Sequence, residues 1–390
     1  MPRPQFVGPI EFPVHVELNL GLEGAITGRT EIGYVDGQAG HLVYRGYTIE
    51  DLAENSCYEE VAYLLLFGEL PTQARYDAFC KELVESRAIP GQVVDALRIL
   101  PRSVHPMLAL EVATAALGSF DPMAEDESLD TKTKIGVKLV SQIATLTGAV
   151  ARLRQGKEPV DPDPQLGHAA NFLYMMTGQR PSETAARVMD IALLLHADHG
   201  MNNSTFTCMC IGSTMSDIYS AVTGGVASLK GPLHGGANER SLRELMTVKD
   251  VAGAVEYVKQ AREQKKKIMG FGHRVYKAYD PRARILSRYA EKLTAEGGET
   301  KLYQIARKVE AEVIAAYGEK GIFPNVDFYS GIVYHELGIA TELFTPIFVV
   351  GRMAGWVARV LEYVKDNRIF RPRAQYVGAL DQSYVPMKQR

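Results

Sequence analysis

Residues 267 to 282 combine glycines that allow a tight backbone turn with side chains that can move a proton and hold an anion. Gly270 and Gly272 permit a tight turn and a close approach of the backbone to a ligand, because neither has a side chain. His273 follows this turn and can donate a hydrogen bond or transfer a proton near neutral pH. Arg282 ends the tract with a planar fork that matches a carboxylate, so the tract predicts a ligand site.

A second histidine lies in a glycine-rich turn, Gly-Pro-Leu-His-Gly-Gly-Ala-Asn-Glu over residues 231–239, ahead of an expected helix. Unpaired N–H groups at a helix start create a partial positive field, which favours the neutral form of a nearby imidazole. A neutral His234 can hydrogen-bond to a carbonyl oxygen that becomes an enolate. A packed histidine that only supports the turn is the alternative interpretation.

Asp327 lies between Val326 and Phe328, in a segment that begins with a proline. A carboxylate in apolar surroundings has a raised pKa and becomes a better base near neutral pH. A helix N-cap is the alternative role for this aspartate.

Two further histidines, His196 and His199, would share one face of a helix, as in a two-histidine metal site. No glutamate stands between them in the spacing of a zinc protease, so anion binding by His199 at a helix end is the favoured interpretation. Two arginines are further candidates. Arg352 has Phe348 and Trp356 one helical turn away, and its burial is costly unless a carboxylate of the protein or of a ligand meets it.

Arg371 stands in a C-terminal Arg-Pro-Arg segment and is another possible anion clamp. A solvated tail arginine is the alternative. Two nucleotide motifs are missing: the tract after residue 270 lacks the third glycine of a dinucleotide fingerprint, and no GxxxxGK[ST] sequence occurs.

The elements that must position these residues are almost all helices. Asp36-Gly37 between apolar segments predicts a β-hairpin within residues 30–49. Apolar periodicity, caps, glycines and prolines then predict helices over 49–55, 58–67, 72–88, 90–98, 105–118, 134–154, 167–176, 182–197, 217–229, 238–246, 250–266, 281–294, 301–317 and 331–364. The predicted fold is therefore mainly α, with residues 121–133 as an exposed acidic loop or helix cap.

The ligand-like motifs concentrate between about 217 and 330, which suggests a smaller domain inserted into a larger one. We expect a large helical domain over residues 1–219, a small mobile domain over 220–330, and a return to the large domain with a C-terminal tail over 331–390.

Bulk composition excludes several classes of protein. The 390 residues carry a formal net charge of −3, without the basic excess that a nucleic-acid partner requires. The first 18 residues do not form a signal peptide, and the apolar stretch 344–361 contains two arginines, so no membrane span is expected. The four cysteines have no regular spacing and are expected to be reduced thiols, as in a cytoplasmic protein.

Three motifs, in their order along the chain, resemble those of the citrate synthase family. They are Gly-Pro-Leu-His-Gly-Gly-Ala-Asn-Glu around His234, Gly-Phe-Gly-His-Arg-Val-Tyr-Lys-x-x-Asp-Pro-Arg from Gly270 to Arg282, and Pro-Asn-Val-Asp-Phe-Tyr-Ser-Gly around Asp327. The segments 34–38 and 44–47 are similar to the family as well. The resemblance implies an all-α homodimer with shared active sites, whose small domain closes over the substrates, and which needs neither a cofactor nor a metal.

The resemblance also implies roles for matching residues. Asp327 would remove a methyl proton from acetyl-CoA while His234 hydrogen-bonds the thioester oxygen, and His273 would polarise the ketone of oxaloacetate. Citryl-CoA would then be hydrolysed to citrate and CoA in the closed site. The implied oxaloacetate ligands are His199, Arg282, Arg352 and, from the partner subunit, Arg371. The implied CoA-binding residues are Lys277, Gly270 and Gly272.

Some features depart from the family pattern, and alternatives remain open. Asn203 and Cys208-Met-Cys210 are unusual, and the expected dimer lacks the N-terminal domain of NADH-sensitive hexamers. The nearest alternative is a 2-methylcitrate synthase that uses propionyl-CoA, since one methyl group changes binding by only about 1–3 kcal/mol. A noncatalytic protein that binds CoA or carboxylates, and a metal-dependent hydrolase built on His196 and His199, are the others.

Overall fold

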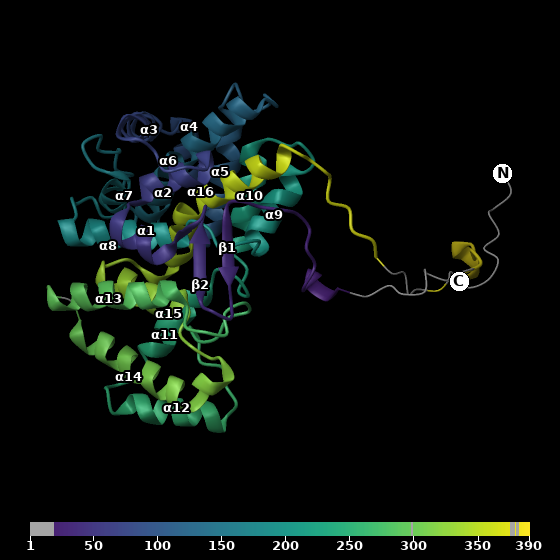
Figure 1. Cartoon of the computed structure of the whole chain (residues 1–390). Helices are drawn as coiled ribbons and strands as arrows, with labels where there is room; N and C mark the ends of the chain where they lie inside the picture. Colours follow the sequence, from purple (N-terminus) through teal and green to yellow (C-terminus); the bar gives the residue numbers. More distant parts are fainter. Residues whose placement is uncertain (1–18, 298, 375–378, 380–381) are drawn as a thin grey trace. The chain divides into compact units, whose positions relative to one another are not determined.

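The computed structural model describes residues 19–297, 299–374, 379 and 382–390 (Figure 1). Residues 30–368 form one compact unit, and the described parts of 1–29 and 369–390 form a second. In the described residues the α-helices are α1 Ile49–Asn55, α2 Tyr58–Phe67, α3 Gln73–Glu85, α4 Gly91–Arg98, α5 Pro106–Ser119, α6 Leu129–Arg154, α7 His168–Thr177, α8 Glu183–His196, α9 Asn203–Gly212, α10 Ile218–Leu229, α11 Ala237–Leu245, α12 Gly253–Glu263, α13 Pro281–Ala295, α14 Thr300–Tyr317, α15 Val326–Glu336 and α16 Phe344–Val364. The mainly helical fold class is confirmed.

The predicted hairpin is also confirmed. Strands β1 Gly33–Asp36 and β2 His41–Tyr44 pair antiparallel, and β3 Tyr47–Thr48 adds a short third strand beside β2. The Asp36 carboxylate accepts hydrogen bonds from the backbone of Gln38 at 3.0 Å and of Ala39 at 2.9 Å, which stabilises the loop. Directly after β3, the Thr48 side chain caps α1 by accepting from the Asp51 N–H.

Helix α16 forms the centre of the large helical group. It packs against α2, α6, α8, α9 and α10 (Figure 1), and every residue from Phe344 to Leu361 is buried. Among the described residues, only the segment Thr341–Val364 is long and apolar enough to cross a membrane. The most apolar 18-residue stretch of that segment is wholly buried in the protein, which identifies it as the core helix of the fold.

The helices differ from the prediction in three places. Helix α6 begins at Leu129, inside the stretch 121–133 that was expected to be a loop or helix cap, and Ser128 of that stretch caps it by accepting from the Thr131 N–H. Helix α9 was not predicted. The expected helical region 331–364 contains the end of α15, which begins at Val326, and the whole of α16, separated by a turn in which Gly338 adopts a φ of +72°.

Helices α11 to α15 gather at one end of the compact unit (Figure 1). Within this group α15 packs against α11 and α13, and α14 packs against α12 and α13. The group carries His273, Arg282 and Asp327 on its loops and helix starts. A small domain over 220–330 that moves separately from the rest stays a prediction.

Candidate active site

Two of the predicted motifs are joined by a short stretch of backbone pairing. The Gly272 N–H donates to the Phe323 carbonyl at 2.9 Å, and the Asn325 N–H donates to the Gly270 carbonyl at 2.9 Å. The Asn325 side-chain amide also donates to the Gly272 carbonyl at 2.8 Å. Since His273 follows the first paired segment and Asp327 follows the second, the pairing holds these two residues in one region.

Asp327 is the second residue of α15 and is half-buried. Asn325 is the N-cap of this helix, and its side-chain oxygen accepts from the Asp327 N–H at 3.0 Å. The N-cap alternative for Asp327 is therefore wrong. Burial raises the pKa of the Asp327 carboxyl from 3.8 to about 7, although the positive charge of Arg282 opposes this rise. Asp327 can therefore act as a base near neutral pH.

The ring of His273 is held in one tautomer by the backbone. Its Nδ1 accepts from the N–H groups of Val275 at 3.0 Å and Tyr276 at 3.1 Å. A backbone N–H can only donate, so Nδ1 is unprotonated and the proton of the neutral ring lies on Nε2. Burial and the charge of Arg282 lower the pKa of His273 to about 4. His273 therefore offers an Nε2–H donor to a ligand.

His234 has the opposite tautomer. Its Nε2 accepts from the Ser204 N–H at 3.3 Å and lies 2.8 Å from the Ser204 hydroxyl oxygen, which itself accepts from the Trp356 ring N–H at 3.2 Å. The proton of the neutral ring is therefore on Nδ1. Burial and the charge of Arg352 lower the pKa of His234 to about 4. The predicted neutral ring is found, but burial causes it, since α11 begins three residues later at Ala237.

His199 lies just beyond the end of α8, so the prediction that it shares a helix face with His196 was wrong. The turn that carries it is fixed by Asp198, which binds Arg359 of α16 through two contacts of 3.0 and 2.7 Å. The Tyr44 hydroxyl of β2 donates to the Asp198 carbonyl at 2.7 Å, so the hairpin also positions this turn.

The His199 ring points toward the tract around His273. The two ring centroids are 5.1 Å apart, and the His199 Nε2 is 3.3 Å from the Tyr276 hydroxyl. Burial, followed by the charge of Arg282, holds the pKa of His199 well below its usual range. The neutral imidazole is therefore available as a hydrogen-bond partner for a ligand.

Arg352 is buried without a carboxylate partner among the described residues. Its Nε donates to the His196 carbonyl at 2.5 Å, and its Nη1 has no hydrogen-bond partner. The Phe348 ring lies 4.7 Å from the guanidinium carbon and has its centroid 6.5 Å from that of His234. Burial lowers the pKa of Arg352 to about 10. A buried guanidinium with an unused donor favours an anionic ligand beside His234.

Arg282 is only partly free. Its Nε and Nη2 bind the Asp280 carboxylate at 3.0 and 2.8 Å, so part of the predicted carboxylate fork is occupied by the protein itself. The charge of Arg282 nevertheless lowers the pKa of His199, His273 and Asp327. Arg282 is therefore near all three groups, and its Nη1 lies outside the pair with Asp280.

A metal site on His196 receives no support from the described residues. The Nδ1 of His196 is 2.6 Å from the Ala192 carbonyl, and burial lowers its pKa to about 3. No group of three or more His, Cys, Asp or Glu side chains able to hold a metal occurs in the part of the chain that the structure describes. The four cysteines are free thiols, and the sulfur of Cys208 packs against Gly225 between α9 and α10.

Lys277 lines an open hollow of about 640 Å³ beside the His273 tract. Sequence reasoning missed two further cations there, Arg284 on α13 and Lys320, because they stand outside the recognised motifs. The hollow is lined by Gln38, Lys277, Ala278, Tyr279, Arg284, Gly318, Glu319, Lys320, Gly321 and Phe323. Its positive lining suits a polyanion.

The two glycines of the tract have a clear structural role. Gly270 has a φ of +82°, and an added Cβ would lie 2.5 Å from the Ser241 hydroxyl and 2.9 Å from the Phe328 Cβ. The Gly270 carbonyl and the Gly272 N–H and carbonyl are already bonded to residues 323–325. Their predicted contact with CoA stays a prediction.

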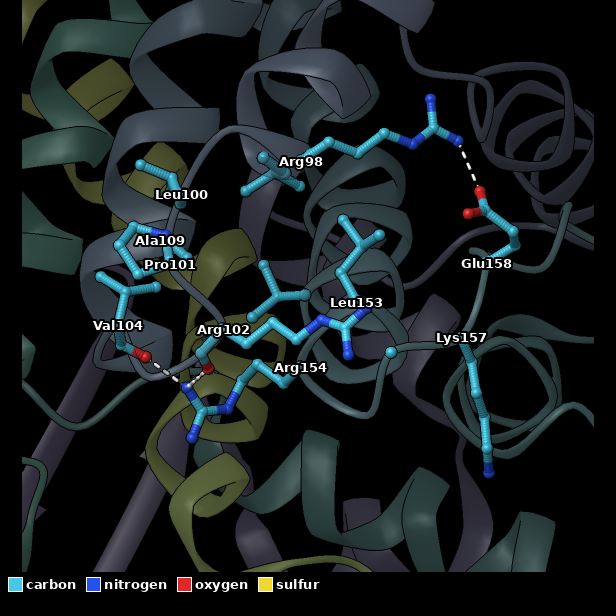
Figure 2. A pocket seen from close by; sticks show the side chains of 13 residues that line it. Arg98, Leu100, Pro101, Arg102, Val104, Ala109, Leu153, Arg154, Lys157 and Glu158 are labelled. Atoms are coloured by element: carbon cyan, nitrogen blue, oxygen red, sulfur yellow. Dashed lines mark hydrogen bonds and ion pairs between the residues drawn. The ribbon is translucent and has the colours of Figure 1, made fainter.

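A separate cavity of about 170 Å³ lies between the end of α6 and the connection from α4 to α5 (Figure 2). None of the predicted site residues lines it. Arg98 binds Glu158 at 2.6 Å, and Arg154 donates to the backbone carbonyls of Arg102 and Val104 (Figure 2). These cations hold neighbouring loops in place.

Arg371 belongs to the second unit of the chain and is exposed there. Its predicted contact with a ligand in the partner subunit stays a prediction. Sequence reasoning missed Ser204, Trp356 and Asp198, which orient the histidines. No sequence signal linked Ser204 to Trp356, because 152 positions separate them.

Comparison with known proteins gives a consistent result. The family model for the citrate synthase C-terminal domain matches residues 21–373. A citrate synthase of Deinococcus radiodurans is 46% identical over 370 residues, which cover 95% of this chain and 98% of the relative. A 2-methylcitrate synthase of Shewanella oneidensis is 39% identical and covers 95% of this chain and 97% of the relative.

Solved structures agree with these relatives. The citrate synthase of Pyrobaculum aerophilum superposes with a TM-score of 0.92 at 42% identity and covers 97% of this chain and 100% of that one. The citrate synthase of Thermoplasma acidophilum, solved as a ternary complex with carboxymethyl coenzyme A and oxaloacetate, has a TM-score of 0.91 at 36% identity, with coverages of 96% and 100%. The chain belongs to the citrate synthase family.

Proposed function

We propose that this protein condenses acetyl-CoA with oxaloacetate and water to give citrate and free CoA. The observation that carries the proposal is the pairing of a base, Asp327 with a pKa of about 7, with two neutral histidines that present N–H donors. A thioester methyl group is so weak an acid that a base must act together with an electrophile. Membership of the citrate synthase family supports the same reaction.

In the first step, the Asp327 carboxylate removes a proton from the methyl group of acetyl-CoA. The Nδ1–H of His234 donates to the thioester oxygen, which gains negative charge as the enol forms. The Ser204 backbone N–H donates to Nε2 and keeps that proton on Nδ1. A donor fixed before the reaction needs no reorganisation when the charge develops.

In the second step, the enol carbon attacks the ketone carbon of oxaloacetate and forms the new C–C bond. The Nε2–H of His273 donates to the ketone oxygen and supplies its proton as the alkoxide develops. The proton that Asp327 removed from the methyl group replaces it, so His273 ends neutral and Asp327 ends as a carboxylate. The product is citryl-CoA. Water then attacks the thioester carbonyl, the C–S bond breaks, and the thiol of CoA leaves with a proton.

Oxaloacetate is held by cations around the histidines. Arg352 has an unused, buried Nη1 donor, Arg282 keeps one nitrogen outside its pair with Asp280, and His199 adds a neutral donor or acceptor. A dianion needs several such groups to offset the loss of its hydration. We assign the remaining contact to Arg371 of the partner subunit in a homodimer, as the family resemblance implies.

CoA is assigned to the hollow beside the His273 tract. Lys277, Arg284 and Lys320 supply positive charge for its phosphates. The Thermoplasma acidophilum relative, solved with a CoA derivative and oxaloacetate, supports binding of both substrates by this fold. No metal or other cofactor enters these steps, because side chains perform both proton transfers. We assign the protein to the cytoplasm, in keeping with its free thiols.

The test is release of CoA thiol with oxaloacetate present or omitted, comparing acetyl-CoA with propionyl-CoA. We expect oxaloacetate-dependent release with a higher kcat/KM for acetyl-CoA. Preference for propionyl-CoA would instead favour the 2-methylcitrate synthase alternative. The Shewanella oneidensis relative, which is a 2-methylcitrate synthase, supports that alternative. Binding of both substrates without thiol release would favour a noncatalytic binding protein. Unchanged activity after treatment with a chelator is expected, and its loss would favour a metal-dependent enzyme.

A further inference from the structure

We infer that Glu310, on α14, is a positioning residue for the proposed condensation: its carboxylate ties the tract that carries His273 to the helix that carries Asp327. This role rests on the proposed function. Glu310 lies outside every motif of the sequence and does not line the site.

The Glu310 carboxylate is buried, with 5% of the residue exposed, and both of its oxygens are used. Oε1 accepts from the Tyr279 hydroxyl, and Oε2 accepts from the Tyr329 hydroxyl. Arg307, one helical turn before Glu310, donates to Oε2 at 2.5 Å and to the Tyr329 hydroxyl oxygen at 3.3 Å. One carboxylate therefore joins three segments of the chain.

The two tyrosines lie next to residues that the proposed reaction uses. Tyr279 directly precedes Asp280, whose carboxylate binds Arg282 and also accepts from the Val326 N–H at 3.2 Å. Tyr279 is also part of the wall of the hollow assigned to CoA. The carboxylate thus holds the end of the tract that contains the anion-binding arginine.

Tyr329 stands two residues after Asp327 in the first turns of α15 and is fully buried. Its ring is 5.1 Å from that of Phe328, which packs against Gly270. A shift of Tyr329 would therefore move both the start of α15 and the glycine turn before His273. Misplacement by about 1 Å of groups around a reacting atom can cost about 100-fold in rate.

The Glu310 network is better suited to positioning the segments it joins than to stabilising the fold. A buried charged network adds little net stability compared with apolar packing of the same volume, because desolvation of the ions offsets their attraction. Such a network does, however, admit only one arrangement of its hydrogen bonds. Glu310 therefore acts on the reaction through the distance and orientation of Asp327 relative to the His273 tract.

The test compares Glu310→Gln with Glu312→Gln. Glu312 stands on the same helix and, within the described part of the chain, forms an ion pair with Lys308 alone, at 2.7 Å, so it controls for loss of a carboxylate from α14. Each variant is assayed for kcat and KM with acetyl-CoA, for the isotope effect on kcat with methyl-deuterated acetyl-CoA, and for its thermal unfolding midpoint. Amide hydrogen exchange of residues 276–282 and 326–330 is measured in parallel.

We expect Glu310→Gln to lower kcat by about 10- to 100-fold. The isotope effect should grow, because proton removal by a misplaced Asp327 limits the rate more strongly. Exchange of both segments should become faster, while Glu312→Gln should match the wild type. Tyr329→Phe should also lower kcat. In the double variant the fall in kcat should be smaller than the product of the two single falls, because both substitutions break the same contact.

A lower unfolding midpoint with unchanged kcat, isotope effect and amide exchange would make Glu310 purely structural and overturn the inference. Unchanged values in every measurement would overturn it too. Failure of the proposed function would be seen separately, as a wild-type protein that releases no CoA in the presence of oxaloacetate.

Discussion

Backbone contacts set opposite tautomers in the two histidines of the site. Two N–H groups donate to Nδ1 of His273, whereas the Ser204 N–H donates to Nε2 of His234. Each ring is left with one N–H to donate, and the low pKa values of about 4 keep both rings neutral under ordinary conditions. A neutral donor can stabilise a developing oxyanion without holding the substrate too tightly before reaction.

The pH dependence of the rate should follow Asp327. Its carboxyl has a pKa of about 7, and only the ionised form can take a proton, so activity is lost as pH falls through about 7. His234 and His273 stay neutral down to about pH 4, so they do not contribute to the loss of activity near pH 7. Initial rates from pH 5 to 9 measure kcat/KM for acetyl-CoA. A rate that rises as pH falls from 8 to 6 would contradict the role of Asp327.

Ser204 should support the donor role of His234. In Ser204→Ala the hydroxyl that lies 2.8 Å from Nε2, donates to the Asn202 side-chain oxygen and accepts from the Trp356 N–H is lost. The backbone N–H of residue 204 still donates to Nε2, so the tautomer is kept while the ring is held less firmly. We expect kcat to fall about tenfold, equivalent to about 1.4 kcal/mol, with the Kd of oxaloacetate nearly unchanged. Steady-state kinetics and calorimetry measure the two values. Ser220→Ala, at an exposed serine, should behave as wild type, and equal effects of the two variants would contradict the assignment.

At the scale of elements, the pairing of residues 270–272 with 323–325 joins the histidine tract to the start of α15. A glycine is required at 270 both by its φ of +82° and by the neighbouring Ser241 and Phe328 side chains. Gly338 has a similar φ of +72°, but an added Cβ there would meet nothing within 4 Å. Substitutions at these two glycines therefore distinguish the effect of backbone strain, present at both, from that of a steric clash, present only at Gly270.

Gly270→Ala should reduce kcat by about 10-fold or more, because the added methyl group pushes the turn away from α15 and moves His273. Gly338→Ala carries the backbone strain alone and should cost only about 1 kcal/mol of stability, with kcat retained. Thermal unfolding and CoA release distinguish the two effects. Equal kcat values in the two variants would show that the turn does not position His273.

Elements with local signals could be predicted, and those without could not. Thr48 caps α1 with its own side chain, and Gly68 ends α2 in the left-handed region, so the chain marks these boundaries itself. Helix α9 was missed because its start, Asn202 and Asn203 followed by Ser204, is polar and typical of a turn. In the structure Asn202 caps it by accepting from the Thr205 N–H.

The residues proposed to carry the chemistry could be predicted from their types and motifs, but the residues that position them could not. His234, His273 and Asp327 stand in glycine- and proline-bearing motifs whose composition suits ligand contact. Trp356 and Arg359 act across long separations of sequence, for example 161 positions between Arg359 and Asp198. Periodicity describes which face a residue occupies, and it contains no information about which distant residue it meets.

At the scale of the whole molecule, the buried helix α16 supplies the polar groups around which the site is built. Arg352 and Arg359, two turns apart, contact the turn that carries His199, and Trp356 between them reaches Ser204. Gly355 lets the helix approach this turn, since an added Cβ would lie 2.0 Å from the Ala197 carbonyl. The apolar core and the site therefore share one helix.

The proposed homodimer with Arg371 acting across the interface makes a prediction for mixed dimers. Asp327→Asn and Arg371→Gln should each be strongly impaired as homodimers. A mixed dimer should regain one intact site, because the subunit with Asp327 receives Arg371 from its partner. Co-expression with two affinity tags, followed by a CoA-release assay, measures this recovery. Absence of recovery in purified mixed dimers, or full activity in a monomer by sedimentation, would contradict a shared site.

The most direct measurement is oxaloacetate-dependent CoA release by Asp327→Asn beside the wild type, with oxaloacetate binding followed by calorimetry. Removal of a general base typically costs about 10²- to 10⁴-fold, so kcat should fall within that range. The Kd of oxaloacetate should stay within about twofold, because its ligands are the arginines and histidines. The variant Asp250→Asn, at an exposed aspartate, should match the wild type. Near-normal turnover by Asp327→Asn would contradict the central role of Asp327 as the base.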